Sequence, residues 1–203
     1  MNAAADQRIC FVGDSFVAGV GDPEHLGWVG RVCARAAADG HALTAYNLGV
    51  RRETSADISG RWQAECARRL PPGCSARVVF SFGVNDMVME AGRERVAPPD
   101  SAANLQRLLE AARRHYDVAM IGPPPVADEA LDQRVAALTQ RYSDLCAQLS
   151  LPYLPMHAAL HASDAWMHEV RLGDGAHPRA AGYAAFAARV ADWKDWWFHR
   201  SAA

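Results

Sequence analysis

The chain has 203 residues, a length that fits one sizeable domain or two small ones. Half of the residues are hydrophobic and 22% are charged, which is ordinary globular composition and argues against disorder. The 21 basic and 23 acidic residues give a formal net charge of −2. A chain this close to neutral shows no sign of binding nucleic acid or an acidic membrane surface.

The first eight residues lack the charged-then-apolar pattern of a signal peptide. No stretch approaches the roughly 18–20 apolar residues that are needed to cross a bilayer. The five cysteines are widely spaced and form no C-x-x-C motif, which favours free thiols in a reducing compartment. We therefore expect a cytoplasmic protein without an integral membrane span.

Short β-rich runs alternate with amphipathic helical stretches along the chain. The pattern predicts, in order, strand 8–13, helix 28–39, strand 42–48, helix 55–70, strand 76–82, helix 101–115, strand 117–121, helix 130–150, strand 152–154 and helix 179–197. Such alternation implies a parallel sheet with helices on both faces. Because no break in composition interrupts it, we expect residues 1–203 to form one three-layer α/β/α domain with about five strands.

Distinctive clusters follow the first three predicted strands, and another precedes the last predicted helix. They are Gly13-Asp14-Ser15, Asn47-Leu48-Gly49, Gly83-Val84-Asn85-Asp86 and Asp174-Gly175-Ala176-His177-Pro178. In parallel sheets, ligands bind beyond the carboxyl ends of the strands. A hydroxyl nucleophile, a histidine with a carboxylate three residues upstream and several hydrogen-bond donors are the groups that acyl transfer needs.

The four clusters, in this order, resemble the motif blocks of the GDSL or SGNH hydrolases, which are esterases and lipases with a flavodoxin-like α/β fold. The resemblance covers essentially the whole chain. It implies a triad in which Ser15 is the nucleophile, His177 the general base and Asp174 the residue that orients the imidazole. It further implies an oxyanion hole made by the backbone N–H groups of Ser15 and Gly49 and the side-chain amide of Asn85, and no metal or cofactor.

Taken singly, each block has a simpler interpretation. Ser15 also suits a helix N-cap, with Asp14 as an alternative cap of the same turn. Asn85-Asp86 also suits a turn, and His177 a surface position. All four falling at the ligand end of one sheet favours the catalytic interpretation.

Four other motifs are absent or weak. The glycines after the first strand do not complete a dinucleotide fingerprint, and there is no phosphate-binding loop motif. The nucleophile elbow of the α/β-hydrolases is absent because Val17 occupies its last position. His157 and His161, at i, i+4 spacing with Asp164 nearby, suit either a metal site or a solvated loop, and we expect no metal.

The turn after Gly49 departs from many relatives, which continue with small residues where this chain has Val50-Arg51-Arg52-Glu53. Arg51 and Arg52 either meet an anionic group of the substrate or pair with Glu53 or Asp57 on the surface. Val50 and Arg51 are therefore candidate substrate-binding residues.

Apolar residues before the fourth block and after the third are further candidates. Met87, Trp166 and Met167 are expected on loops that flank the nucleophile, where they either form an acyl pocket or pack beneath a loop. Since the connections are short, we expect a shallow, open site for small acyl groups.

The last predicted helix carries Trp193, Trp196, Trp197 and Phe198, which cannot all face one stripe of a helix. A homo-oligomer formed through exposed members of this set is one expectation, and core packing is the other.

The expected function is a serine esterase that hydrolyses carboxylic esters of small acyl groups through an acyl-enzyme. An acyl-CoA thioesterase, a lysophospholipase and a sugar O-acetylesterase are alternatives with the same chemistry. A non-catalytic protein that binds an anionic ligand through Arg51 and Arg52 is the alternative of a different class.

Overall fold

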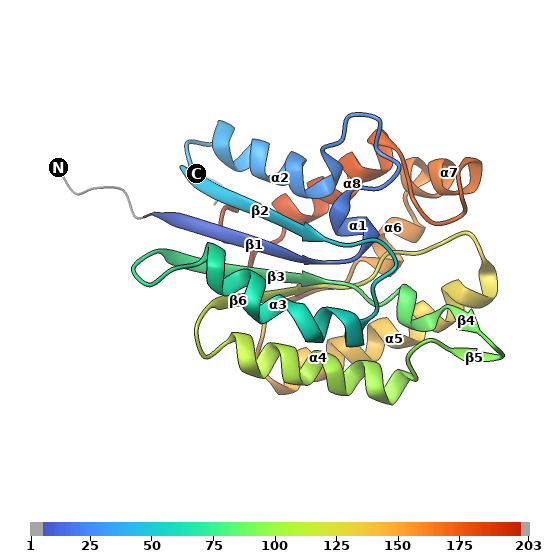
Figure 1. Cartoon of the computed structure of the whole chain (residues 1–203). Helices are drawn as coiled ribbons and strands as arrows, with labels where there is room; N and C mark the ends of the chain where they lie inside the picture. Colours follow the sequence, from blue (N-terminus) through green and yellow to red (C-terminus); the bar gives the residue numbers. More distant parts are fainter. Residues whose placement is uncertain (1–5, 200–203) are drawn as a thin grey trace.

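A five-stranded parallel sheet lies at the centre of the fold in the computed structural model, which describes residues 6–199 (Figure 1). Its strand order is β2-β1-β3-β6-β7, and the strands are β1 (Gln7–Gly13), β2 (Leu43–Gly49), β3 (Ser75–Ser81), β6 (Asp117–Ile121) and β7 (Tyr153–Leu154). A small antiparallel hairpin of β4 (Met89–Glu90) and β5 (Arg93–Glu94) stands apart from this sheet.

Helices cover both faces of the sheet. One face carries α3 (Ser55–Arg69), α4 (Pro98–Ala112) and α5 (Glu129–Gln148), and the other carries α2 (Gly27–Ala38) and α8 (Ala180–Ala191) (Figure 1). Shorter helices complete the fold: α1 (Ser15–Ala18), the 3-10 turn η1 (Asn85–Met87), α6 (His157–His161) and α7 (Asp164–Leu172). This arrangement confirms the expected three-layer α/β/α fold. Among the described residues, no helix combines the length and apolar character needed to cross a bilayer.

Local sequence signals account for where the main helices begin. Thr54 caps α3 in a capping box with Asp57. Asp128 accepts the N–H of Leu131 at the start of α5. Proline opens α4, where its missing N–H removes no helical hydrogen bond.

The predicted loop before the fourth block is wrong, because residues 164–172 form helix α7. Ser163 caps this helix by accepting the N–H of Trp166, and its buried face carries Trp166, Met167 and Val170. That spacing of i, i+1 and i+4 is a helical stripe in a segment too short to stand out in the sequence. His157 and His161 likewise lie on helix α6 rather than on a solvated loop.

The predicted last helix is too long, since α8 ends at Ala191. Trp193, Trp196 and Phe198 follow it in turns and are at most 9% exposed. The Trp196 ring lies 6.3 Å from that of Phe11 on β1. These three residues therefore belong to the core, and Trp197 is partly buried and packs against it. A homo-oligomer formed through this segment stays a prediction.

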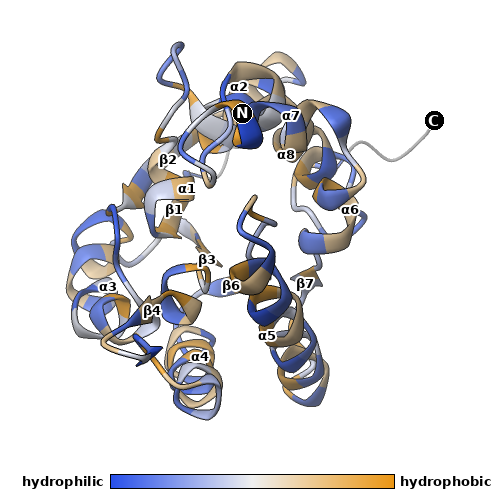
Figure 2. Ribbon diagram, turned by 90° about the vertical axis from the view of Figure 1, so that its right-hand side faces the viewer, coloured by the Kyte–Doolittle hydropathy of each residue, from blue (hydrophilic) through white to orange (hydrophobic). Residues whose placement is uncertain are grey.

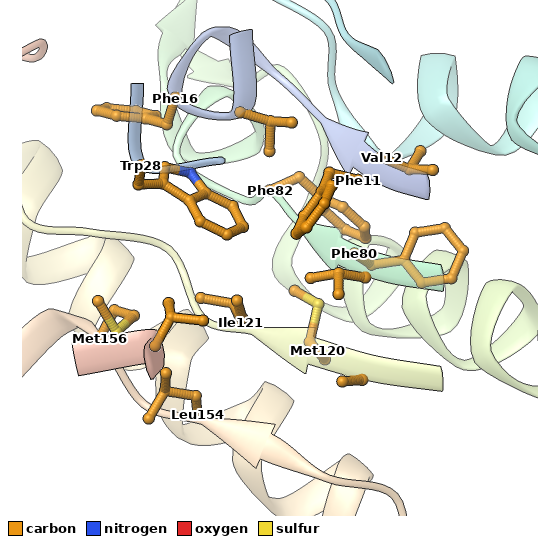
Figure 3. Close-up of a cluster of buried hydrophobic side chains, with 14 of the residues drawn as sticks. Phe11, Val12, Phe16, Trp28, Phe80, Phe82, Met120, Ile121, Leu154 and Met156 are labelled. Atoms are coloured by element: carbon orange, nitrogen blue, oxygen red, sulfur yellow. The ribbon is translucent and has the colours of Figure 1, made fainter. Parts of the chain in front are cut away.

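Aromatic side chains join the sheet to both helical layers, and Figure 3 shows Phe11, Trp28 and Phe80 in one cluster of buried side chains. Phe11 meets Trp28 of α2 edge-on with ring centroids 5.5 Å apart. Phe80 meets Trp62 of α3 in the same way, also at 5.5 Å. Because Phe11 is level with Val79 in the sheet, Phe80 points to the opposite face. Burying one side chain of this kind stabilises the fold by about 1.5–3 kcal/mol.

The register of the sheet brings the ends of its first strands together. Gly13 is level with Gly49 of β2 and with Ser81 of β3. The segments that follow these strands therefore emerge at one edge of the sheet, which Figure 2 views end-on. This is the edge at which the predicted blocks must meet.

Two glycines provide a matched test of the close packing at this edge. A Cβ on Gly49 would lie 2.2 Å from the Ala18 nitrogen, whereas a Cβ on Gly60, inside α3, meets nothing within 4 Å. We expect Gly49→Ala to lower the free energy of unfolding by about 1–3 kcal/mol or more. Gly60→Ala should raise it by about 0.5–1 kcal/mol, because alanine loses less backbone entropy. Urea unfolding of both variants checks this, and a Gly49→Ala protein as stable as the parent would contradict the packing.

Candidate active site

The segment that leaves β1 turns directly into helix α1. Asp14 is the N-cap, and its Oδ1 accepts the N–H of Phe16 at 3.0 Å. Ser15 is the first residue of the helix and is only 5% exposed. The capping role that Ser15 could have had thus belongs to Asp14, which leaves the serine hydroxyl available for another contact.

That contact comes from the loop between α7 and α8. His177 Nε2 lies 2.7 Å from Ser15 Oγ, although 162 residues separate the two in the chain. On the other side of the ring, His177 Nδ1 lies 2.7 Å from Asp174 Oδ2. The three side chains that the sequence singled out therefore form one continuous hydrogen-bonded series.

The backbone also holds Asp174 in place. Its Oδ1 accepts the N–H groups of Ala176 at 3.0 Å and of His177 at 2.8 Å. Burial by itself would raise the pKa of Asp174, but the hydrogen bonds from His177 and Ala176 outweigh burial and lower the pKa to about 2. Asp174 is therefore ionised at neutral pH, as a residue that orients and stabilises an imidazolium must be.

One aromatic ring packs against the imidazole of His177, and a second packs against the first. The Phe16 ring lies 4.9 Å from that of His177, and the Trp166 ring lies 6.1 Å from Phe16. Gly21 approaches the histidine so closely that a Cβ there would lie 3.2 Å from the His177 Cβ, and its φ of +91° also favours glycine. The Asp174 side chain is 53% exposed, so the site opens directly to solvent.

The third strand delivers Asn85 to the same place. Its Nδ2 donates to the Glu53 carbonyl at 3.0 Å and makes a longer contact of 3.4 Å with Asp14 Oδ2. The neighbouring Asp86 is fully buried and accepts the Ser55 N–H at 2.7 Å and the Ser101 hydroxyl. These bonds tie the Asn85 turn to α3 and α4.

Gly49 lies at this edge, but its N–H is already used. It donates to Asn47 Oδ1 at 3.0 Å, and Asn47 Nδ2 in turn donates to the Val17 carbonyl at 2.7 Å. The expectation that this N–H is free for an oxyanion is therefore not met in the structure. The side chain of Asn47 competes for it, which the spacing of the motif could not reveal.

The backbone of the same turn has an unusual conformation at Arg52. Arg52 has a φ of +66°, which is unusual for a residue other than glycine. Its carbonyl accepts a hydrogen bond from Arg95 at 2.8 Å, and the next carbonyl, that of Glu53, holds Asn85. Within residues 6–199 the N–H of Arg52 makes no hydrogen bond.

Arg51 and Arg52 do not pair with Glu53 or Asp57, the surface partners that we expected for them. Glu53 pairs with Arg61, and Asp57 accepts hydrogen bonds from Thr54 in the capping box of α3. The Arg52 guanidinium lies 3.8 Å from Glu90 and is 77% exposed. In the part of the chain that the structure describes, the exposed side chain of Arg51 makes no hydrogen bond or ion pair.

The apolar residues expected to bind substrate divide into two groups. Met87, Trp166 and Met167 are at most 5% exposed and pack in the core, and the Trp166 indole donates to the Pro125 carbonyl at 3.0 Å. The alternative of plain packing therefore holds for these three. Val50 is 42% exposed, on the turn that follows β2.

The paired histidines take a partner that the sequence did not suggest. His157 Nε2 lies 2.9 Å from Asp132 Oδ1, and His161 Nε2 lies 3.7 Å from Asp132 Oδ2. The same carboxylate accepts the Val126 N–H at 3.0 Å. Asp132, on α5, therefore holds both α6 and the segment that precedes α5. Within the described chain no group of three such side chains has the geometry of a metal site.

Comparisons with known proteins show the family to which the chain belongs. The sequence model of the GDSL-like lipase/acylhydrolase family matches residues 11–185. The chain belongs to this family. It is 28% identical over 182 residues to the esterase TesA of Pseudomonas aeruginosa, an alignment that covers 88% of this chain and 83% of that protein.

Solved structures show the same fold. An acetylxylan esterase of Geobacillus stearothermophilus, Axe2, solved as a catalytic mutant, matches with a TM-score of 0.79 and 16% identity over the full length of both chains. A lipase/acylhydrolase of Enterococcus faecalis matches with a TM-score of 0.75 and 22% identity, covering 91% of this chain and 93% of that one.

Membership of the GDSL-like family identifies the chain as a hydrolase that acts on ester bonds. The family therefore favours catalysis over the alternative of a non-catalytic anion-binding protein. It leaves open which ester is hydrolysed.

Asp14, which precedes Ser15, provides a test of the electrostatics of this site. Burial raises its pKa to about 7, and the negative charges of Asp86 and Glu53 act in the same direction. The folded state then holds a proton that the unfolded state loses above about pH 4, so Asp14 lowers stability increasingly as the pH rises from about 4 to 7. Asp14→Asn keeps an acceptor for Phe16 but carries no charge. Its stability relative to the parent should increase between pH 5 and 8, by on the order of 2 kcal/mol.

Asp57→Asn is the matched control, because hydrogen bonds from Thr54 lower the pKa of Asp57 and its ionised form stabilises the fold. This variant should be less stable than the parent at pH 8, with the difference shrinking as the pH falls below about 4. Chemical unfolding from below about pH 4 to pH 8 measures the stability of each variant relative to the parent. A pH-independent difference for Asp14→Asn would show that the carboxyl group is ionised in the folded state throughout.

Proposed function

We propose that the chain is a serine esterase that uses Ser15, His177 and Asp174 as a catalytic triad and hydrolyses esters of small acyl groups. The observation that carries this proposal is the continuous series from Asp174 through His177 to Ser15, with both contacts at 2.7 Å. A serine hydroxyl is a weak nucleophile by itself and becomes effective when an adjacent base accepts its proton as it attacks.

In the first half-reaction, Ser15 Oγ attacks the ester carbonyl carbon while its proton moves to His177 Nε2. The electron pair of the carbonyl bond moves to oxygen, and the tetrahedral oxyanion forms next to an imidazolium that Asp174 stabilises. Collapse of this intermediate breaks the bond to the alcohol. The alcohol takes the proton from Nε2 as it leaves, and an acyl group remains on Ser15.

In the second half-reaction, water replaces the alcohol. His177 Nε2 removes a proton from the water as the hydroxide oxygen attacks the acyl carbon. When the second tetrahedral intermediate collapses, the carboxylic acid leaves and the proton returns to Ser15 Oγ. The exposure of Asp174 at the mouth of the site is consistent with ready access for water.

The oxyanion is stabilised, in this proposal, by the Ser15 N–H and the Asn85 amide. The Asn85 amide donates one N–H to the Glu53 carbonyl, and this bond orients the amide. Its other contact, with Asp14 Oδ2, is long at 3.4 Å. The third donor that the resemblance implies is the N–H of Gly49, which would exchange its bond to Asn47 Oδ1 for one to the oxyanion. Loss of one such donor typically costs about 100- to 1,000-fold in rate.

Substitution of the nucleophile tests the proposal directly. Ser15→Ala should reduce hydrolysis of p-nitrophenyl acetate by at least about 1,000-fold without changing the circular dichroism spectrum. Ser59→Ala, on α3, removes the same hydroxyl from a position outside the site and should keep parental activity. A fluorophosphonate should label the parent and Ser59→Ala but not Ser15→Ala. Parental rates in Ser15→Ala would refute the triad.

The substrate class is argued from the surroundings of Ser15. Met87, Trp166 and Met167, which would have to line a deep acyl channel, are core residues. A short acyl group such as acetyl suits the open site, and the structural relative Axe2 is an acetylxylan esterase. A sugar O-acetylesterase is therefore favoured over an acyl-CoA thioesterase or a lysophospholipase that uses the same residues.

A panel of four substrates ranks these alternatives by kcat/KM. We expect p-nitrophenyl acetate and an acetylated xylooligosaccharide to exceed a long-chain lysophospholipid by at least about tenfold, because one misplaced methylene already costs about 1–3 kcal/mol of transition-state binding. Acetyl-CoA is the fourth substrate and tests the thioesterase alternative. A higher kcat/KM for the lysophospholipid or for acetyl-CoA would overturn this choice of substrate.

We also propose a cytoplasmic location and a small-molecule substrate without a nucleic-acid partner. All five cysteines are free, and three of them are buried, which suits a reducing compartment.

A further inference from the structure

Arg61, on helix α3, reaches the edge of the sheet that carries the catalytic residues. Its guanidinium donates to the carbonyl oxygens of Gly13 at 3.1 Å and of Leu48 at 2.9 Å. It also donates to the carboxylates of Glu53 at 2.6 Å and of Glu65 at 3.0 Å. Its side chain is 18% exposed, and that of Glu53 is 17% exposed. One side chain thus joins the ends of β1 and β2 and the turn that follows β2.

Three of these contacts bear on groups of the proposed site. The Gly13 carbonyl belongs to the peptide unit that leads into Asp14 and Ser15, and it also accepts the Val50 N–H at 3.0 Å. The Leu48 carbonyl shares its peptide unit with the N–H of Gly49, at the start of the turn. Glu53 is held through its carboxylate, while its own carbonyl accepts the Asn85 amide.

We propose that Arg61 is a positioning residue for ester hydrolysis, whose guanidinium fixes the nucleophile segment, the turn after β2 and Asn85 relative to one another. The inference rests on the proposed function, since it assigns Arg61 to the reaction of Ser15. Arg61 touches neither substrate nor the triad and acts through the segments that it joins.

The shape of the guanidinium is what the position requires. Its planar fork presents several donors in fixed directions, and here they reach two carbonyls and two carboxylates at once. A lysine ammonium at the same place keeps the charge but cannot satisfy four acceptors spread around a plane. A displacement of about 1 Å in a catalytic group can cost about 100-fold in rate. Loss of the hydrogen bonds made by Arg61 should therefore lower kcat.

Stability alone is the competing explanation for Arg61. Ion pairs that are partly open to solvent, as this one is, typically contribute about 0–1 kcal/mol. The Glu65 contact is of this ordinary kind, because it joins residues four apart on one helix. Glu65→Gln is therefore the matched control, since it removes one ion pair of Arg61 and leaves the contacts to Gly13, Leu48 and Glu53.

The test compares Arg61→Lys, Arg61→Met and Glu65→Gln with the parent. For both Arg61 variants we expect kcat for p-nitrophenyl acetate to fall by about 10- to 100-fold. KM should stay within about twofold, and the pH at half-maximal kcat/KM should not move, because the triad is untouched. Glu65→Gln should keep the parental kcat. Thermal unfolding of each variant reports its folding, and Arg61→Lys carries the test if Arg61→Met does not fold.

The outcomes separate this inference from the proposed function. A parent protein without esterase activity or phosphonate labelling at Ser15 would overturn the proposed function and, with it, the role of Arg61. An active parent whose folded Arg61→Lys variant keeps the parental kcat would overturn the inference about Arg61 alone. A fall in kcat of the same size in Glu65→Gln would also overturn it, because the effect would then follow the loss of any ion pair on α3.

Discussion

The parallel pairing of β1 with β2 and β3 in a common register is the constraint on which the site depends. Gly13 is level with Gly49 and Ser81, and a Cβ at Gly13 would lie 2.0 Å from the Ser81 carbonyl oxygen. The strands can approach this closely only because glycine ends β1. Serine, the arginine-rich turn and Asn85 then follow the three strands at one edge, where short turns leave them little freedom to lie elsewhere.

The histidine reaches this edge from the opposite end of the chain and needs its own anchors. Glu169 of α7 accepts the N–H groups of Arg179 at 2.9 Å and Gly182 at 2.7 Å, so a carboxylate from one helix caps the start of α8 directly after His177. Phe16 supports the ring. The arrangement joins a rigid sheet edge, with Arg61 across its strand ends, to a base held by two helices. The geometry proposed for ester hydrolysis is thus built from distant segments that are each fixed independently.

Much of this was predictable from the sequence. Buried strands such as β3 are apolar runs between turn residues. Three polar blocks follow strands and the fourth precedes the last helix, so the layers, the residues of the proposed triad and Asn85 could be placed from the sequence. Side-chain partners could not. Glu53 pairs with Arg61 and not with the adjacent arginines, and Asn47 accepts the N–H of Gly49. Such partners depend on distances in the folded chain, which the sequence pattern does not contain. Short helices such as α7, and aromatic turns such as 193–198, lack enough residues for a periodic signal.

The central claim is that acyl transfer passes through Ser15. The most direct measurement is peptide mass spectrometry of the protein after rapid acid quenching during the first turnover of p-nitrophenyl acetate. The proposed mechanism predicts one acetyl group per chain, attached to Ser15. An acetyl group on another residue, with Ser15 unmodified while p-nitrophenol is released, would contradict it.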